Sequence, residues 1–236
     1  MNPLPVFQKA ESYLNIQLTH AGTGGSAHPT GPFITLSRES GTGGSVLARE
    51  LAARLPAEEG HHWEVYSGNL IEEMLRTNNL PAHLARFLPE DKVSELDASV
   101  GEMVGLHPNL WTLVAKTNEL MRRLARSGHA ILLGRGANFA TRDLPHGIHL
   151  RLVAPPGYRD ARVARLLRMD IGEAAAWNAG RDAARMRYVR ATFNAALADP
   201  AAYDLVFNVA QVPFDTMVSL ILHYAEVQAP HVAAGH

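Results

Sequence analysis

A short glycine-rich segment between an apolar and an amphipathic stretch constrains the fold of this chain more than any other feature. Residues 33–37 are mostly apolar and are typical of a buried strand. Three glycines follow within positions 41–44. After them, Leu47, Leu51 and Leu55 recur at the four-residue interval of one helix face. The order strand, glycine turn, helix predicts a phosphate cradle, because glycines let the backbone approach an anion and the first N–H groups of the helix point at it.

This glycine loop, residues 38–45, departs from the usual phosphate-loop pattern G-x-x-x-x-G-K-[ST]. When Gly43 and Ser45 are placed on the last glycine and the hydroxyl residue of the pattern, Gly44 stands at the lysine position. A backbone cradle and a magnesium-binding hydroxyl are therefore expected, but the phosphate-holding ammonium is missing. An ordinary strand–turn–helix junction is the alternative interpretation of this stretch.

Composition limits the functions that the chain can perform. Its 236 residues are 47% hydrophobic and 19% charged, which suffices for one large α/β domain. The formal net charge of −1 creates no global field that would favour nucleic acid or a membrane surface. Cysteine is absent, which excludes disulfides and thiolate nucleophiles. Because no apolar run approaches the roughly 20 residues of a membrane span and no signal pattern opens the chain, a cytoplasmic protein is expected.

The apolar stretches predict an α/β fold with a five-stranded parallel sheet. Strands are expected at 33–37, 63–66, 130–134, 148–153 and 203–208, and helical stretches separate them. Ligands on such sheets bind at the carboxyl ends of the strands. The glycine loop and the turn at 134–136 both follow strands, so we expect them at the same edge of the sheet.

The chain is expected to form one domain over residues 33–228. Residues 1–32 are interpreted as an N-terminal appendage that ends in a flexible Gly/Ser/His/Pro linker, and residues 229–236 as a disordered tail. An irregular insert with several prolines and glycines is expected at about 67–108, and an arginine-rich helical lid at about 157–192.

Arg135 stands between two glycines directly after a strand that is predicted to be buried. A guanidinium in this position can hold a phosphate of a second substrate, because arginine binds phosphate oxygens in a bidentate manner. The alternative is an ion pair with a nearby carboxylate such as Asp143.

Arginines dominate the predicted lid, and only three of the 22 basic residues in the chain are lysine. The segment Asp170–Glu173 predicts a break that makes the lid a helical hairpin. Such a hairpin can close on transferring phosphates and exclude water. The alternative is a solvated helix face paired with Asp160, Asp170, Glu173 and Asp182. The lid arginines are Arg159, Arg162, Arg165, Arg168, Arg181, Arg185, Arg187 and Arg190.

Three ordered motifs resemble those of the cytidylate kinase-like proteins, which belong to the P-loop nucleoside monophosphate kinase group. The motifs are 34–45, 132–145 and 203–208, and the resemblance covers roughly residues 33–226. It implies a three-layer P-loop NTPase fold with a five-stranded parallel sheet. It also implies a helical lid between the fourth and fifth strands and a helical, mononucleotide-binding insert after the second.

The resemblance implies roles for individual residues as well. The phosphates of ATP would lie on Gly41, Thr42, Gly43, Gly44 and Ser45, with Ser45 also on Mg²⁺. The acceptor would be held by Arg135, Gly136 and Asn138, and Arg181 and Arg185 would be the lid arginines that act on the transferring phosphate.

Two departures from true cytidylate kinases stand out. Gly44 replaces the lysine of their loop, and Gly136 replaces an aspartate of their Gly-Arg-Asp motif that helps to read the nucleotide. Arg38 is the candidate substitute for the missing lysine, because it is close in sequence.

The sequence therefore predicts a phosphotransferase that uses Mg²⁺ and ATP. The acceptor would be a nucleoside monophosphate of the CMP or dCMP type or another small molecule, without nucleic acid or membrane partners. A catalytically degenerate, kinase-like sensor of a nucleotide or anion is the alternative, and a protein-interaction scaffold built on residues 79–108 is a third. The sequence leaves open the acceptor, its base preference and the oligomeric state, for which a homodimer is one alternative.

Overall fold

The computed structural model describes residues 31–56, 61–68 and 107–233. Within these ranges, five parallel strands form one sheet in the order β2-β3-β1-β4-β5. Each strand begins and ends within two residues of its predicted bounds, which confirms the predicted α/β fold. The strands are β1 (Phe33–Arg38), β2 (Glu64–Ser67), β3 (Ala130–Leu133), β4 (Gly147–Val153) and β5 (Leu205–Asn208).

β1 is the central strand, and its position places the glycine loop between two other loops. Ile34 of β1 is in register with Ile131 of β3 on one side and with Ile148 of β4 on the other. All three side chains are buried, as expected for strands covered on both faces. The carboxyl end of β1 therefore lies between the turn that follows β3 and the segment that follows β4.

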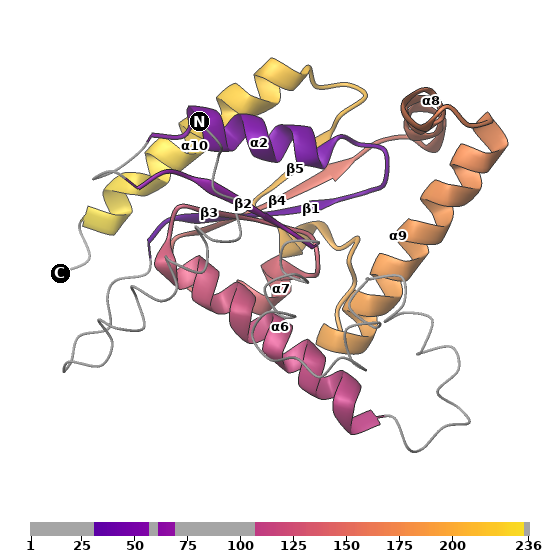
Figure 1. Ribbon diagram of the computed structural model, residues 1–236. Coiled ribbons are helices and arrows are strands. Elements are labelled where there is room, and N and C mark those ends of the chain that lie inside the picture. The colour runs from indigo at the N-terminus through magenta and orange to yellow at the C-terminus, as the bar shows by residue number, and fades with distance from the viewer. Residues whose placement is uncertain (1–30, 57–60, 69–106, 234–236) are drawn as a thin grey trace, which may run out of the picture.

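Helices cover both faces of the sheet and complete a three-layer architecture (Figure 1). One face packs against α2 and α10 through a core that includes Leu47 and Leu51 of α2 and Met217 and Ile221 of α10. The opposite face carries α6 and α7. The bounds are α2 (Gly44–Arg54), α6 (His107–Ser127), α7 (Ala137–Thr141) and α10 (Phe214–Ala233). The short helix α7 was not predicted, and α10 continues past residue 228, where the tail was predicted to begin.

The lid between β4 and β5 is a hairpin of α8 (Pro156–Leu167) and α9 (Ile171–Phe193), which pack against each other at one end of the sheet (Figure 1). The predicted break at 170–173 is wrong by a few residues. Arg168, in the left-handed conformation, ends α8. The carboxylate of Asp170 accepts hydrogen bonds from the N–H groups of Gly172 and Glu173, so this segment is a capping box that starts α9.

Residues 1–30 and 69–106 lie outside the described residues. The predicted appendage and most of the predicted insert therefore stay predictions. Among the helices of the described part, none combines the length and the apolar composition needed to cross a membrane.

Candidate active site at the carboxyl edge of the sheet

The glycine loop leads into α2 through a backbone conformation that favours glycine. Gly41 and Gly43 have φ angles of 82° and 88°, in the left-handed region. Gly43 is the residue before the first turn of α2, and no side chain in the described part of the chain caps this helix. The first N–H groups of α2 therefore have no partner within the helix. Together with the helix dipole, they make this end of α2 suited to an anion.

The two hydroxyl residues of the loop differ in their surroundings. Thr42 is buried, and its hydroxyl donates a hydrogen bond of 2.7 Å to the main-chain carbonyl of Glu39. This contact closes the loop on itself. Ser45, predicted to bind Mg²⁺, is exposed in the first turn of α2. Its hydroxyl is therefore accessible at the mouth of the loop.

The side chain of Arg38 extends from the start of α2 to the turn after β3. A Cβ atom built at Gly44 would lie 3.1 Å from Cγ of Arg38, and one built at Gly134 would lie 2.0 Å from its Nη1. The aliphatic part of Arg38 thus takes the space beside position 44, where the family's lysine would begin. Its guanidinium lies over Gly134, between the glycine loop and the turn that carries Arg135.

Arg135 is 4% exposed and has a φ of 50°, a strained conformation for a residue with a side chain. Its guanidinium lies beside the end of β2, where a Cβ atom at Gly68 would be 3.3 Å from Nε of Arg135. The alternative partner Asp143 is engaged elsewhere. Both of its oxygens accept hydrogen bonds from Arg122, at 2.5 and 2.8 Å. The Arg122 guanidinium lowers the pKa of Asp143 to about 2.

Gly136 and Asn138, the other predicted acceptor residues, are tied to the surrounding structure. Gly136 has a φ of 64°, and a Cβ atom there would lie 2.4 Å from Cε2 of Phe193. The amide of Asn138 is buried and donates a long hydrogen bond, of 3.4 Å, to the carbonyl of Ala202. The space in which the family's aspartate would stand is therefore filled by an aromatic ring from the end of α9.

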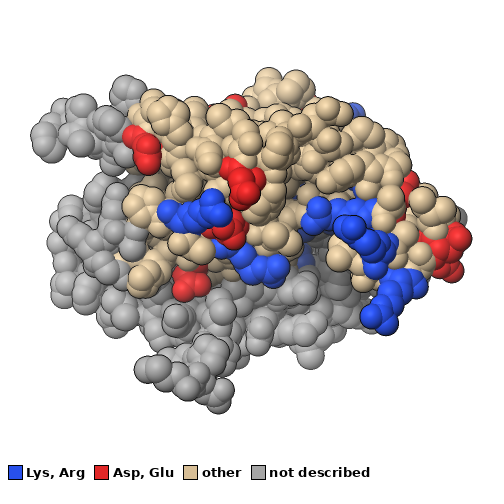
Figure 2. Space-filling view, turned by 90° about the horizontal axis from the view of Figure 1, so that it is seen from above, with Lys and Arg blue, Asp and Glu red and all other residues tan. Residues whose placement is uncertain are grey.

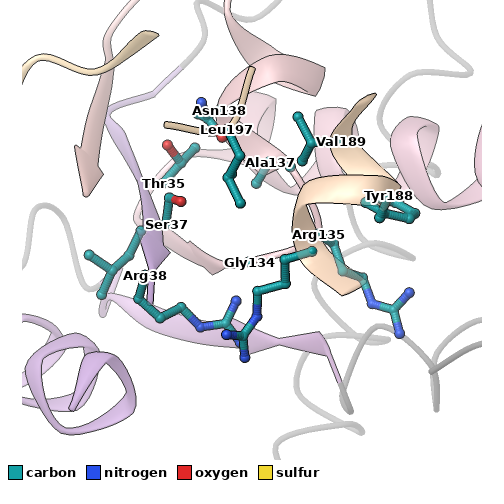
Figure 3. A pocket seen from close by; sticks show the side chains of 13 residues that line it. Thr35, Ser37, Arg38, Gly134, Arg135, Ala137, Asn138, Tyr188, Val189 and Leu197 are labelled. Carbon is teal, nitrogen blue, oxygen red and sulfur yellow. The ribbon is translucent and has the colours of Figure 1, made fainter. Parts of the chain in front are cut away.

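A pocket lies between these elements and is called the arginine pocket below. Its cationic lining consists of Arg38, Arg135 and Arg185, contributed by the end of β1, the turn after β3 and α9. In Figure 3, Arg38 and Arg135 lie toward one end of the pocket, and Thr35, Ser37 and Leu197 toward the other. The arrangement offers several guanidinium donors in a small space, which suits a compact oxyanion.

The predicted lid arginines Arg181 and Arg185 are in different places. Arg185 lines the arginine pocket and donates a hydrogen bond of 2.7 Å to the hydroxyl of Ser40 in the glycine loop. Arg181 is exposed, and its guanidinium stacks 4.6 Å from the ring centre of Trp177. In this conformation, Arg185 alone of the two reaches the pocket.

Two further lid arginines contact the glycine loop and were not predicted as site residues. A Cβ atom at Gly41 would lie 2.8 Å from the carbonyl oxygen of Arg159, and one at Gly43 would lie 2.6 Å from Nη2 of Arg162. Both arginines lie in α8, which begins just after β4 reaches the same sheet edge. The place of these arginines, soon after a strand that ends at the ligand edge, was the one sequence signal that could have identified them as site residues. Basic side chains gather at the right of the face in Figure 2, toward the end where Figure 1 draws α8.

A buried cation beneath the loop was also missed. Arg151 of β4 is 6% exposed and donates a hydrogen bond of 3.0 Å to the hydroxyl of Ser37. Its Nη2 lies 4.0 Å from the carboxylate of Glu39, and its guanidinium lies 5.5 Å from the ring centre of Tyr203. Because strand periodicity alone gives Arg151 no acidic partner, the sequence offered little signal for this contact.

A family model described as the cytidylate kinase-like family matches residues 33–211. No curated protein matches the sequence.

Among solved structures, an uncharacterized protein from Eubacterium ventriosum is 18% identical, with a TM-score of 0.60 over 83% of this chain and 98% of that one. This likeness shows the fold alone. A gluconokinase from Sinorhizobium meliloti is 13% identical over 89% and 100% of the two chains, with a TM-score of 0.48. A shikimate kinase from Bacteroides thetaiotaomicron is 17% identical over 83% and 98%, with a TM-score of 0.44. Both scores are too low to carry weight.

Proposed function

Because this chain belongs to the cytidylate kinase-like family, we propose that it is a phosphotransferase with Mg²⁺ and ATP as donor. The acceptor is a nucleoside monophosphate of the CMP or dCMP type or another small molecule. The observation that carries the proposal is the convergence of Arg38, Arg135 and Arg185 on one pocket beside the glycine loop. Three cations from three separate elements at the ligand edge of a parallel sheet suit the neutralisation of phosphate charge.

The donor half of the site is the glycine loop. The left-handed glycines and the uncapped start of α2 fit a polyphosphate, because residues without a Cβ atom let the main-chain N–H groups approach an anion. Ser45 would supply the hydroxyl ligand of Mg²⁺, as the phosphate-loop pattern requires. Arg38 would supply the cation that the pattern assigns to lysine, since its side chain occupies the space beside Gly44.

The acceptor half is the arginine pocket, in which Arg135 would hold the acceptor's phosphate and Arg185 would reach the transferring group. In the reaction, an acceptor oxygen forms a bond to the γ-phosphorus while the bond from that phosphorus to the β–γ bridging oxygen breaks, and ADP leaves. Phosphoryl transfer depends mainly on positioning and charge neutralisation. A phosphate acceptor is already deprotonated, so no protein base is required.

A binding protein that senses a nucleotide or an anion is the second candidate. Two positions favour it, because the places of the family's lysine and aspartate are filled by Arg38 and Phe193. Such a protein would bind the nucleotide at the same loop and release no ADP.

A coupled assay of ADP release with CMP, dCMP, UMP and small polyols tests the proposal. Ser45→Ala and Arg135→Ala are each expected to lower turnover at least about tenfold, the effect of losing one charge-stabilising contact in a transition state. Arg165 is exposed on α8, so Arg165→Ala is the matched control and should leave turnover unchanged. Turnover that survives both site variants would exclude this site. Tight nucleotide binding by calorimetry with no ADP release would favour the sensor.

A further inference from the structure

Asp182 of α9 joins the lid to the glycine loop with both of its carboxylate oxygens. Oδ1 accepts a hydrogen bond of 2.8 Å from the N–H of Ser40 and one of 3.0 Å from Arg185. Oδ2 accepts one of 2.7 Å from Arg159. The side chain is 19% exposed, so these charge-assisted contacts are partly shielded from water. One carboxylate thus connects the loop backbone, α8 and α9.

Arg185 is fixed by two of these partners at once. Its Nη1 donates to Asp182 and also to the hydroxyl of Ser40, at 2.7 Å. The side chain is 13% exposed and lines the arginine pocket. A free arginine side chain has many rotamers, and ordering it on binding costs free energy. Contacts that hold the guanidinium in place beforehand remove that cost from the binding of an anion.

Arg159 anchors Asp182 to a rigid part of the fold. Its Nε donates to the carbonyl of Ala154, the residue after β4, at 3.0 Å, and its Nη1 donates to the carbonyl of Ser40, at 3.1 Å. It also lies 3.4 Å from the carboxylate of Glu39. The position of Asp182 is therefore set by the sheet edge and the loop, and not by α9 alone.

We propose that Asp182 is a positioning residue: it holds Arg185 in the arginine pocket, so that the pocket is arranged in advance for a compact phosphate-like oxyanion. The assignment of this oxyanion to the acceptor rests on the proposed function. The positioning itself is a property of the pocket and is tested by binding, without turnover.

The test is a double-mutant cycle on the binding of inorganic phosphate, measured by calorimetry at constant ionic strength with the glycine loop saturated by Mg²⁺ and a non-hydrolysable ATP analogue. In the wild-type background, Asp182→Asn should weaken phosphate binding about tenfold, the scale of one charge-assisted hydrogen bond. In an Arg185→Ala background the same substitution should change binding less than about twofold, because its effect passes through Arg185.

Asp160→Asn is the matched control. Asp160 also joins α8 to α9, by accepting a hydrogen bond of 2.8 Å from Asn178. Within the part of the chain that the structure describes, no hydrogen bond joins Asp160 to the glycine loop, so Asp160→Asn should leave phosphate binding unchanged. Ser40→Ala is the second test variant, since it removes one contact of Arg185 and no charge; it should weaken phosphate binding about threefold, again only when Arg185 is present.

Equal losses with and without Arg185, or no loss in either Asp182→Asn or Ser40→Ala, would overturn the positioning role. Failure of the wild type to bind phosphate would overturn it as well. Failure of the proposed function would give a different result, because the ATP analogue would produce no binding heat. The double-mutant cycle on phosphate binding, run without the analogue, would still test the role of Asp182.

Discussion

Gly136→Ala is predicted to destabilise the protein well beyond the usual effect of a glycine-to-alanine change. Gly136 has a φ of 64°, and the left-handed conformation costs a residue with a Cβ atom about 1–2 kcal/mol. The new Cβ atom would also lie 2.4 Å from Cε2 of Phe193, well inside the roughly 3.5–4.0 Å of an ordinary carbon contact. The Phe193 ring must therefore move by about 1 Å.

The movement of Phe193 has its own cost. The ring stacks on Phe139 with 5.7 Å between the ring centres and meets Tyr188 edge-on at 6.3 Å. An aromatic pair contributes about 0.5–1.5 kcal/mol beyond its buried area, and displacement loses part of it. Together with the backbone term, the free energy of unfolding should fall by about 2–3 kcal/mol.

Urea denaturation followed by circular dichroism measures this difference, provided that the m-value is unchanged. The control is Gly180→Ala on α9, where nothing lies within 4 Å of the added Cβ atom; it should raise stability by up to about 1 kcal/mol. In a Phe193→Ala background, Gly136→Ala should cost only the backbone part, about 1–2 kcal/mol. The reasoning is refuted if Gly136→Ala stays within about 0.5 kcal/mol of the wild type, or if removal of Phe193 does not reduce its cost.

Three other outcomes are expected. Calorimetry should show that Gly44→Lys binds Mg²⁺ and ATP no more tightly than the wild type, because Cγ of Arg38 lies 3.1 Å from the new Cβ atom. Tighter binding is expected only when Arg38→Ala is also present. Tighter binding by the single variant would contradict the assignment of Arg38 as the substitute for the missing lysine. Burial lowers the pKa of His149, so the unfolded chain takes up this proton first and stability should fall as the pH drops below about 6.5. His149→Gln should flatten that slope in urea unfolding series, and an unchanged slope would place its origin elsewhere. Asp143, with a pKa of about 2 beside Arg122, should cause a second loss of stability between about pH 4 and pH 2. Asp143→Asn should remove that loss. It should lower the free energy of unfolding at neutral pH by under about 1 kcal/mol, since this carboxylate is largely exposed. A loss of stability between these pH values that persists in the variant would contradict the role of Asp143.

The arginines show where prediction from the sequence reached its limit. The sequence indicated an arginine-rich lid between β4 and β5, and the structure places α8 and α9 there. Which arginine meets which partner was not predictable. Arg185 reaches the pocket, whereas Arg181, four residues earlier, stacks on Trp177. Residues four apart share a helix face, so spacing alone does not separate these two arginines. Arg185 bonds Asp182 and the hydroxyl of Ser40, which only the fold brings to α9.

The alternative interpretation of the lid arginines as a solvated, paired face is correct in part. Asp182, one of the carboxylates suggested as a partner, does pair with Arg159 and Arg185. It also binds the backbone of Ser40 in the glycine loop, which gives the pairing a place in the site. Asp170, another suggested partner, accepts hydrogen bonds at the start of α9 instead.

The strands and the glycine turn could be read from the amino acids because each depends on local chemistry. Apolar runs such as residues 130–133 form buried strands wherever they lie, and glycine adopts a positive φ with little penalty. The pairing of Asp143 with Arg122, the ring of Phe193 at Gly136 and the reach of Arg38 to Gly134 followed from the packed chain alone. Long charged and aromatic side chains choose among partners that the fold brings within a few ångströms, and no spacing along the chain encodes that choice.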